Sequence, residues 1–125
     1  MKVSVSQESL ARGLNIVNRA IENRPTMPVL GNVLLEAEEA RLRLSTVNAT
    51  LGMDITCWIN AKVHTSGAIT LPARTFADLV SNLSPEQVDL TLDGPTQTVN
   101  LRCGGTRANI KGIDADEFPP VQRGD

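Results

Sequence analysis

Arginine and asparagine side chains recur at helical spacing near the N-terminus of this 125-residue chain. Arg12, Asn15, Arg19 and Asn23 are three or four residues apart, so on a helix they lie on one side, together with Glu8. Guanidinium and amide groups in such a row can hydrogen-bond a phosphate backbone without reading bases. Periodicity alone favours an ordinary solvated face, and both interpretations stay open at this point.

Arg24 follows this row directly and lies between Asn23 and Pro25, with Pro28 a few residues further on. The prolines predict a stiff loop, and a guanidinium on a stiff loop loses less entropy when it binds a phosphate. Alternatively, Arg24 hydrogen-bonds the last carbonyls of the preceding helix.

A second predicted helix carries a similar polar side. Phe76 and Leu79 belong to its apolar stripe, and Arg74, Asp78 and Ser81 lie opposite. This helix could therefore contribute to the same phosphate-binding layer, or present a second solvated face.

Signatures of catalysis or metal binding are missing from the sequence. It has no phosphate-binding glycine loop and no nucleophile elbow. His64 is the only histidine and is predicted to be a surface residue, while Cys57 and Cys103 are predicted to be buried free thiols. We therefore expect a protein that is not an enzyme and needs neither metal nor cofactor.

The composition is that of one folded domain with an aliphatic core. Hydrophobic residues make up 41% of the chain and aromatic residues 2%, and the formal net charge is −2. No apolar run approaches the roughly 18 residues of a membrane span, and no secretory signal is evident. We expect a cytoplasmic protein without membrane contact.

Apolar periodicity predicts the order β-α-β-β-β twice, which is an α+β class. The first unit has strands at 1–6, 29–36, 41–47 and 53–60 and a helix from Gln7 to Ile21, and a polar link follows at 61–66. In the second unit a strand at 67–71 and a helix through Leu83 precede strands near 88–93, 99–102 and 107–111. Two such units should place both helices side by side over a mainly antiparallel sheet built from both sets of strands.

Three segments resemble the bacterial sliding-clamp family, the beta subunit of DNA polymerase III. They are Arg-Pro-Thr-Met-Pro-Val-Leu-Gly-Asn-Val-Leu-Leu at 24–35, Leu-Pro-Ala-Arg-Thr-Phe at 71–76 and Asp-Glu-Phe-Pro at 116–119. The resemblance implies the DNA-clamp fold, with helices lining the hole of a ring, and implies that Arg24 and Arg74 contact DNA. Arg12, Arg19 and Asn23 are candidates through their helical face rather than through a motif.

The resemblance also implies an assembly. In the family, three such domains form a subunit, and two subunits close a head-to-tail homodimer ring. Residues 1–115 would be the first domain and 116–125 the start of a linker to a second domain, so the chain is expected to be a fragment. The subunit interface would use Leu79, Leu83, Arg107, Ala108 and Ile110. The groove for polymerase III and clamp-loader peptides would lie in later domains.

The expected function is that of a non-catalytic processivity factor that encircles and slides on double-stranded DNA and tethers the polymerase. We expect weak, non-specific DNA contacts and an acidic outside, which would reconcile the negative charge with a DNA partner. The alternative is a protein-interaction module that uses the sheet face around Trp58, although the C-terminal tail could instead cover this side chain. A small α+β hydrolase is disfavoured, because no nucleophile motif accompanies His64.

Overall fold

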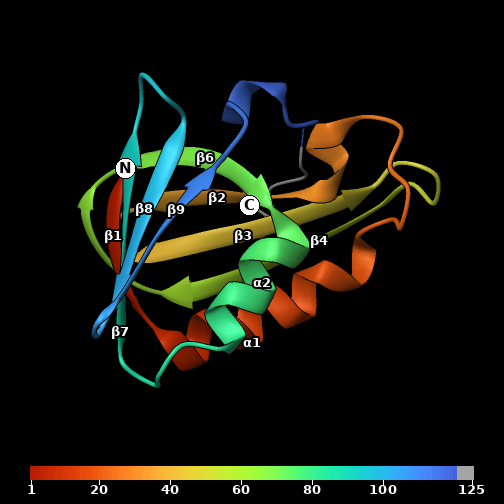
Figure 1. Cartoon of the computed structure of the whole chain (residues 1–125). Coiled ribbons are helices and arrows are strands. Elements are labelled where there is room, and N and C mark those ends of the chain that lie inside the picture. Colours follow the sequence, from red (N-terminus) through yellow and green to blue (C-terminus); the bar gives the residue numbers. More distant parts are fainter. Residues whose placement is uncertain (121–125) are drawn as a thin grey trace.

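The structure, a computed structural model, describes residues 1–120 (Figure 1). The strands are β1 (Lys2–Ser6), β2 (Asn32–Glu38), β3 (Arg41–Asn48), β4 (Met53–Asn60), β5 (Lys62–Thr65), β6 (Gly67–Pro72), β7 (Gln87–Asp93), β8 (Thr98–Cys103) and β9 (Thr106–Lys111). The helices are α1 (Gln7–Val17) and α2 (Ala73–Ser81), with short 3₁₀ turns at Asn18–Ala20, Pro28–Gly31 and Ala115–Glu117.

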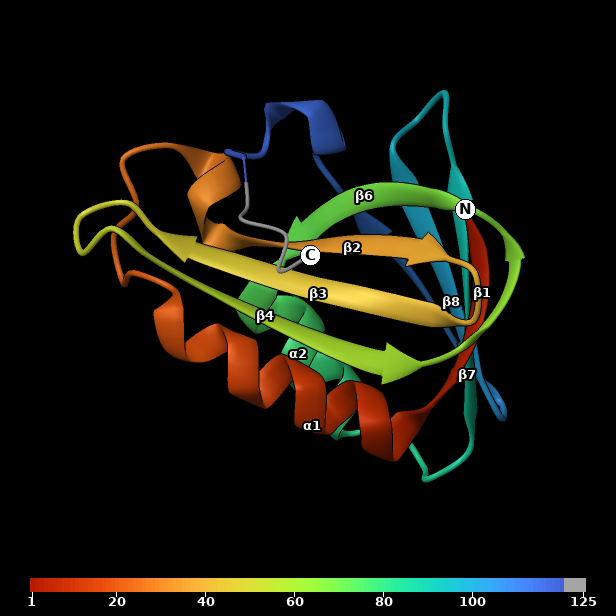
Figure 2. The same ribbon diagram turned by 180° about the vertical axis from the view of Figure 1, so that it is seen from behind.

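The strands form two antiparallel sheets, each built from strands of both units, and the expected helices on mainly antiparallel sheets are confirmed. Sheet A has the order β5-β1-β7-β8-β9 and sheet B the order β4-β3-β2-β6. Each unit therefore gives its first strand to the other unit's sheet: β1 pairs with β7, and β6 pairs with β2. Helices α1 and α2 pack against each other and against strands of sheet B, with α1 along the bottom of the molecule in Figures 1 and 2. The repeated β-α-β-β-β order and the two-helix layer are confirmed.

Some predicted boundaries were wrong, one strand was missed, and the second helix ends at Ser81 rather than at Leu83. Helix α1 ends at Val17 and continues as a 3₁₀ turn to Ala20, short of the predicted end at Ile21. The segment from Pro28 to Gly31 is a 3₁₀ turn because proline suits its first position, so β2 begins only at Asn32. The predicted polar link contains β5, which pairs with β1 and places Val63 against the core.

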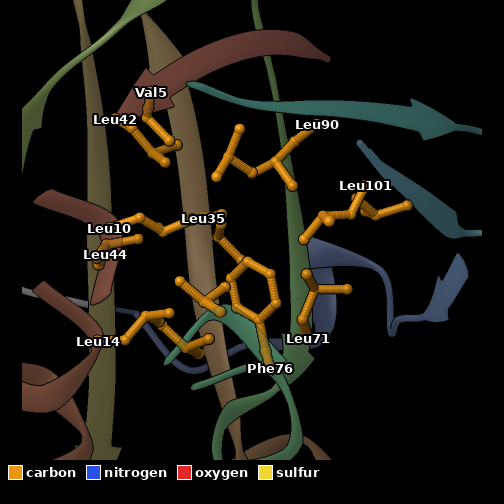
Figure 3. Close-up of a cluster of buried hydrophobic side chains, with 14 of the residues drawn as sticks. Val5, Leu10, Leu14, Leu35, Leu42, Leu44, Leu71, Phe76, Leu90 and Leu101 are labelled. Carbon is orange, nitrogen blue, oxygen red and sulfur yellow. The ribbon is translucent and has the colours of Figure 1, made fainter. Parts of the chain in front are cut away.

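One aliphatic core lies between the two helices and the inner faces of both sheets (Figure 3). Phe76 of α2 is fully buried near its centre, with Leu35 of β2 and Leu71 of β6 close by. Leu10 and Leu14 bring α1 against sheet B beside Leu44. The apolar stripes that the sequence indicated are thus the surfaces that hold both helices in place.

A second, smaller cluster lies on the outer face of sheet B. There Phe118 packs with Val29, Leu30, Leu34 and Val47 and is only 7% exposed. The tail is therefore packed on sheet B through Phe118, beyond the proposed boundary at 115, and residues 121–125 lie outside the described part. The division into a domain and a linker stays a prediction.

Arg43 of β3 lies on the outer face of sheet B but is buried, at 4% exposed. Its guanidinium forms an ion pair with Glu36 on the neighbouring strand and lies 5.5 Å from the centre of the Trp58 ring. Arg41 covers the same ring at 4.0 Å. Trp58 remains 44% exposed, and the described part of the tail packs around Phe118 instead.

Candidate nucleic-acid interface

The exposed sides of the two helices form one polar layer. Leu10, Leu14 and Val17 turn inward on α1, which leaves Arg12 and Asn15 exposed. On α2 the buried positions include Phe76 and Val80, and Arg74, Asp78 and Ser81 are exposed. Because α1 and α2 pack against each other, these polar sides are continuous.

A groove of about 460 Å³ runs between the two helices. It is lined by Ala11, Asn15, Asn18, Arg74, Ala77, Asp78 and Ser81. Two alanines at the bottom keep the helices close, and amide, hydroxyl and guanidinium groups remain at the rim. Apart from Asp78, these are hydrogen-bonding groups of the kind that contact phosphate oxygens.

Arg74 and Asn23 meet at one end of this layer, although 51 positions separate them in the sequence. The Arg74 Nη2 donates a hydrogen bond to Asn23 Oδ1 at 2.7 Å. Arg74 lies in the first turn of α2, where the helix dipole disfavours a positive charge. A cation placed there and held by an exposed amide is available to an external anion.

Arg24 is exposed on the loop that follows, and this loop is fixed at several points. The Glu22 carboxylate accepts a hydrogen bond from Thr50 N at 3.0 Å, which ties the loop to the β3–β4 hairpin. Hydrogen bonds from Thr50 lower the pKa of Glu22, so the carboxylate stays charged. Pro25 packs close to Gly31. The backbone that carries the Arg24 guanidinium is therefore held in place.

Arg12 and Arg19 are exposed but do not join the Arg74–Asn23 pair. Arg12 lines a separate hollow with Trp58, between α1 and the edge strand β4. Arg19 lies in the 3₁₀ turn after α1. The structure thus brings Asn23 and Arg74 together at one end of the helix layer, with Arg24 next to Asn23 in the chain, and leaves Arg12 on the β4 side.

Asn18 was missed by the sequence analysis. Its Nδ2 donates to Ala73 O at 3.0 Å, which links the end of α1 to the start of α2, and its Oδ1 is a buried acceptor without a partner among the described residues. Its capping role could not be predicted because the predicted helix extends past Asn18, whereas Asn18 is the C-cap of α1 in the structure.

The predicted interface residues occupy two places. Leu79 and Leu83 are half-buried against the main core at the end of α2. On the edge strand β9, Ala108 and Ile110 face the core, and Arg107 faces outward. Their proposed role in joining subunits stays a prediction.

Other candidate residues are placed as follows. His64 is exposed, as predicted, and its Nε2 lies 3.2 Å from the Ser4 hydroxyl. Both cysteines are free; Cys103 is buried as predicted, but Cys57 only half-buried. Among residues 1–120 no group of acidic, histidine and cysteine side chains is arranged to hold a metal, and no helix is long and apolar enough to cross a membrane.

The repeated units, the exchanged strands and the arginine-bearing helix layer define a domain of the DNA-clamp type. The chain belongs to the family of the DNA polymerase III beta subunit, N-terminal domain, whose model matches residues 1–122. It is 40% identical to the beta sliding clamp of Synechocystis and 42% identical to that of Synechococcus elongatus, over 97% of this chain in both cases. It spans about a third, 32%, of the length of these relatives.

Solved structures agree with this assignment. The polymerase III beta protein of Caulobacter crescentus superposes with a TM-score of 0.90 at 32% identity, covering 98% of this chain and 33% of that one. The DNA polymerase III beta subunit from Pseudomonas aeruginosa superposes with a TM-score of 0.89 at 28% identity, covering 99% of this chain and 33% of that one. The DNA-clamp fold expected from the sequence is confirmed.

Proposed function

We propose that this chain is the first domain of a non-catalytic sliding clamp that encircles duplex DNA in the cytoplasm and tethers a replicative polymerase. The observation that carries the proposal is the polar helix layer, in which Arg74 and Asn23 meet next to Arg24. Contacts of this kind position a phosphate backbone without reading sequence. Polymerase and clamp loader would bind through domains beyond this chain.

The sheet edges support a ring with head-to-tail joints. Strands β4 and β9 are the last strands of the two units, and each lies at the edge of its sheet. An edge strand offers unpaired backbone groups to another strand. A heterologous contact between two such edges closes a ring when the rotation fits. We place the subunit interface at β9 and the end of α2, with Leu79, Leu83, Arg107, Ala108 and Ile110.

DNA binding by this chain tests the helix layer. We expect weak, sequence-independent binding of a fluorescent duplex, because a sliding ring is held by topology rather than by tight contacts. The double substitution Arg24→Ala/Arg74→Ala should weaken binding about fivefold and reduce the salt slope by roughly two, one for each phosphate contact.

The matched control is Lys2→Ala/Arg102→Ala, which removes two cations from the outer face of sheet A. It should leave duplex affinity within twofold. Nanomolar, sequence-selective binding, or a larger loss in the control than in the Arg24/Arg74 variant, would contradict the proposal.

A further inference from the structure

The outer face of sheet A is basic, although the chain as a whole carries a net charge of −2. Val3, Leu90 and Leu101 mark the inward positions of its strands, so the alternate positions point outward. Outward positions hold five cations and two carboxylates: Lys2, Lys62, Arg102, Arg107 and Lys111, against Asp89 and Asp93. The expected acidic outside is wrong for this face.

Within residues 1–120, none of these five cations has a carboxylate partner within ion-pair distance. Among residues 1–120 the one ion pair joins Arg43 and Glu36, on the other sheet. Lys111 donates to the carbonyl of Thr96 at 2.9 Å, a neutral acceptor. All five side chains belong to exposed residues, so their charge is available to a partner.

A hollow of about 580 Å³ lies in the middle of this face, with Lys2 and Arg102 among its lining residues. Asp89 lines it too, lies directly opposite Arg102 on the neighbouring strand and keeps its negative charge. It accepts hydrogen bonds from the Ser4 hydroxyl at 2.7 Å and from the Gln87 amide at 2.8 Å. Lys2 and Arg102 bring two positive charges to the hollow against the one negative charge of Asp89, so the hollow favours a carboxylate from outside.

We propose that the outer face of sheet A docks an extended acidic segment of a partner protein, with one of its carboxylates in the hollow between Lys2 and Arg102. The choice of partner follows from the charge and from the chemistry of the outward side chains. The outward side chains of β1, β5, β7, β8 and β9 are all polar or charged, so the face offers no pocket for an apolar side chain of a partner.

A peptide fits this face better than a nucleic acid does. Single-stranded nucleic acid is held by aromatic side chains on which bases stack, and the outward positions have no Phe, Tyr or Trp and a single imidazole, that of His64. The carboxylates of Asp89 and Asp93 interrupt the array and repel a continuous phosphate backbone. A peptide can place neutral residues opposite Asp93 and direct its acidic residues to the cations, one of them to the hollow between Lys2 and Arg102. Arginine pairs well with carboxylates through two parallel hydrogen bonds.

The test is fluorescence anisotropy with the 125-residue chain at low salt. The probe is a fluorescein-labelled peptide of alternating Glu and Ser, compared with a Gln/Ser peptide of equal length and with a labelled DNA duplex. We expect the acidic peptide to bind at least tenfold more tightly than the neutral one, and salt to weaken its binding, because the contacts are between exposed charges.

Charge reversal then locates the site. Lys2→Glu/Arg102→Glu should weaken acidic-peptide binding at least tenfold. The matched control Arg12→Glu/Arg19→Glu, which makes the same charge change on the helix layer, should weaken it less than threefold. The amide chemical shifts of Ser4, Asp89 and Arg102 should change when the acidic peptide is added. If the charge-reversal variant unfolds, the Lys2→Gln/Arg102→Gln variant replaces it in the binding measurement.

Three results would overturn the inference. The first is equal affinity for the acidic and neutral peptides. The second is an equal loss of peptide affinity in the two charge-reversal variants. The third is duplex binding that is tighter than peptide binding and is lost in the Lys2/Arg102 variant. The experiment is independent of the proposed clamp function, which depends on Arg24 and Arg74 and would survive a negative result here.

Discussion

Substitution of Gly13 by alanine tests how closely α1 packs on sheet B. A Cβ at this position would lie 2.7 Å from Leu44 Cδ1 and 3.4 Å from Ile59 Cγ2. Leu44 is fully buried on an interior strand beside Leu10 and cannot move aside freely (Figure 3). The crowding costs about 2 kcal/mol of unfolding free energy. The higher helix propensity of alanine returns about 1 kcal/mol. We expect a net loss of about 1 kcal/mol.

Thermal and urea unfolding followed by circular dichroism measure this loss. For a chain of this size it corresponds to a decrease in Tm of roughly 3–6 °C. A double-mutant cycle with Leu44→Val isolates the cause, because valine lacks the carbon that the new Cβ meets. Leu44→Val alone should cost about 1 kcal/mol. In that background Gly13→Ala should stabilise by about 1 kcal/mol, which gives a coupling energy of about 2 kcal/mol.

Two outcomes refute the reasoning. If Gly13→Ala alone stabilises the protein, helix α1 has room to move, and helix propensity rather than crowding determines the change in unfolding free energy. If the two substitutions are additive to within about 0.5 kcal/mol, the loss does not arise at Leu44. The exposed Asn15→Ala on the same helix is the propensity control and should be neutral or slightly stabilising.

Three further substitutions test other parts of the structure. Gly112→Ala should cost at least about 2 kcal/mol in urea unfolding, because its Cβ would lie 2.4 Å from the Thr70 carbonyl oxygen and the backbone must shift; unchanged stability would contradict this. Phe118→Ala should cost about 3 kcal/mol if the tail packs as described, and a loss under about 1 kcal/mol would show that it does not. Ser4→Ala removes the main hydrogen bond that lowers the pKa of Asp89, so NMR titration should find this pKa raised toward its ordinary value. Because the pKa of Asp89 is lowered in the folded state, this group stabilises the protein above its unfolded-state pKa, and the stabilisation is lost as the pH falls through the folded-state pKa. The Ser4→Ala variant should therefore lose less stability in acid than the wild type. An unchanged pKa of Asp89 in the variant would assign the shift to another group.

Periodicity predicted the elements well but could not predict their sheet partners. β1 and β6 both carry apolar residues on alternate positions, and this pattern satisfies either sheet. Their exchange is decided by register with β7 and β2, which only the folded chain defines. β5 escaped prediction because four residues with one inward valine give too little signal.

For the candidate site, helical spacing and sequence motifs identified the residues, and the structure supplied their grouping. Arg74 and Asn23 were proposed for separate reasons, and no pattern within either helix indicates their hydrogen bond. Asn18 was missed because its role depends on where α1 ends and α2 begins, which is a tertiary property. Short-range patterns therefore find exposed cations, but they do not show which of them act together.

The net charge was a poor guide to the partner, because it averages over surfaces of opposite sign. Glu38 and Glu39 lie at the β2–β3 turn, and Asp114, Asp116 and Glu117 lie at the 3₁₀ turn near the C-terminus, whereas cations outnumber carboxylates on the outer face of sheet A. Two cationic faces remain, and both would respond to salt. We expect only the helix layer to contribute to the salt slope of duplex binding, and the Arg24/Arg74 and Lys2/Arg102 variants test this assignment. If only the first pair lowers the slope, the helix layer binds DNA and the sheet face is left for another anionic partner.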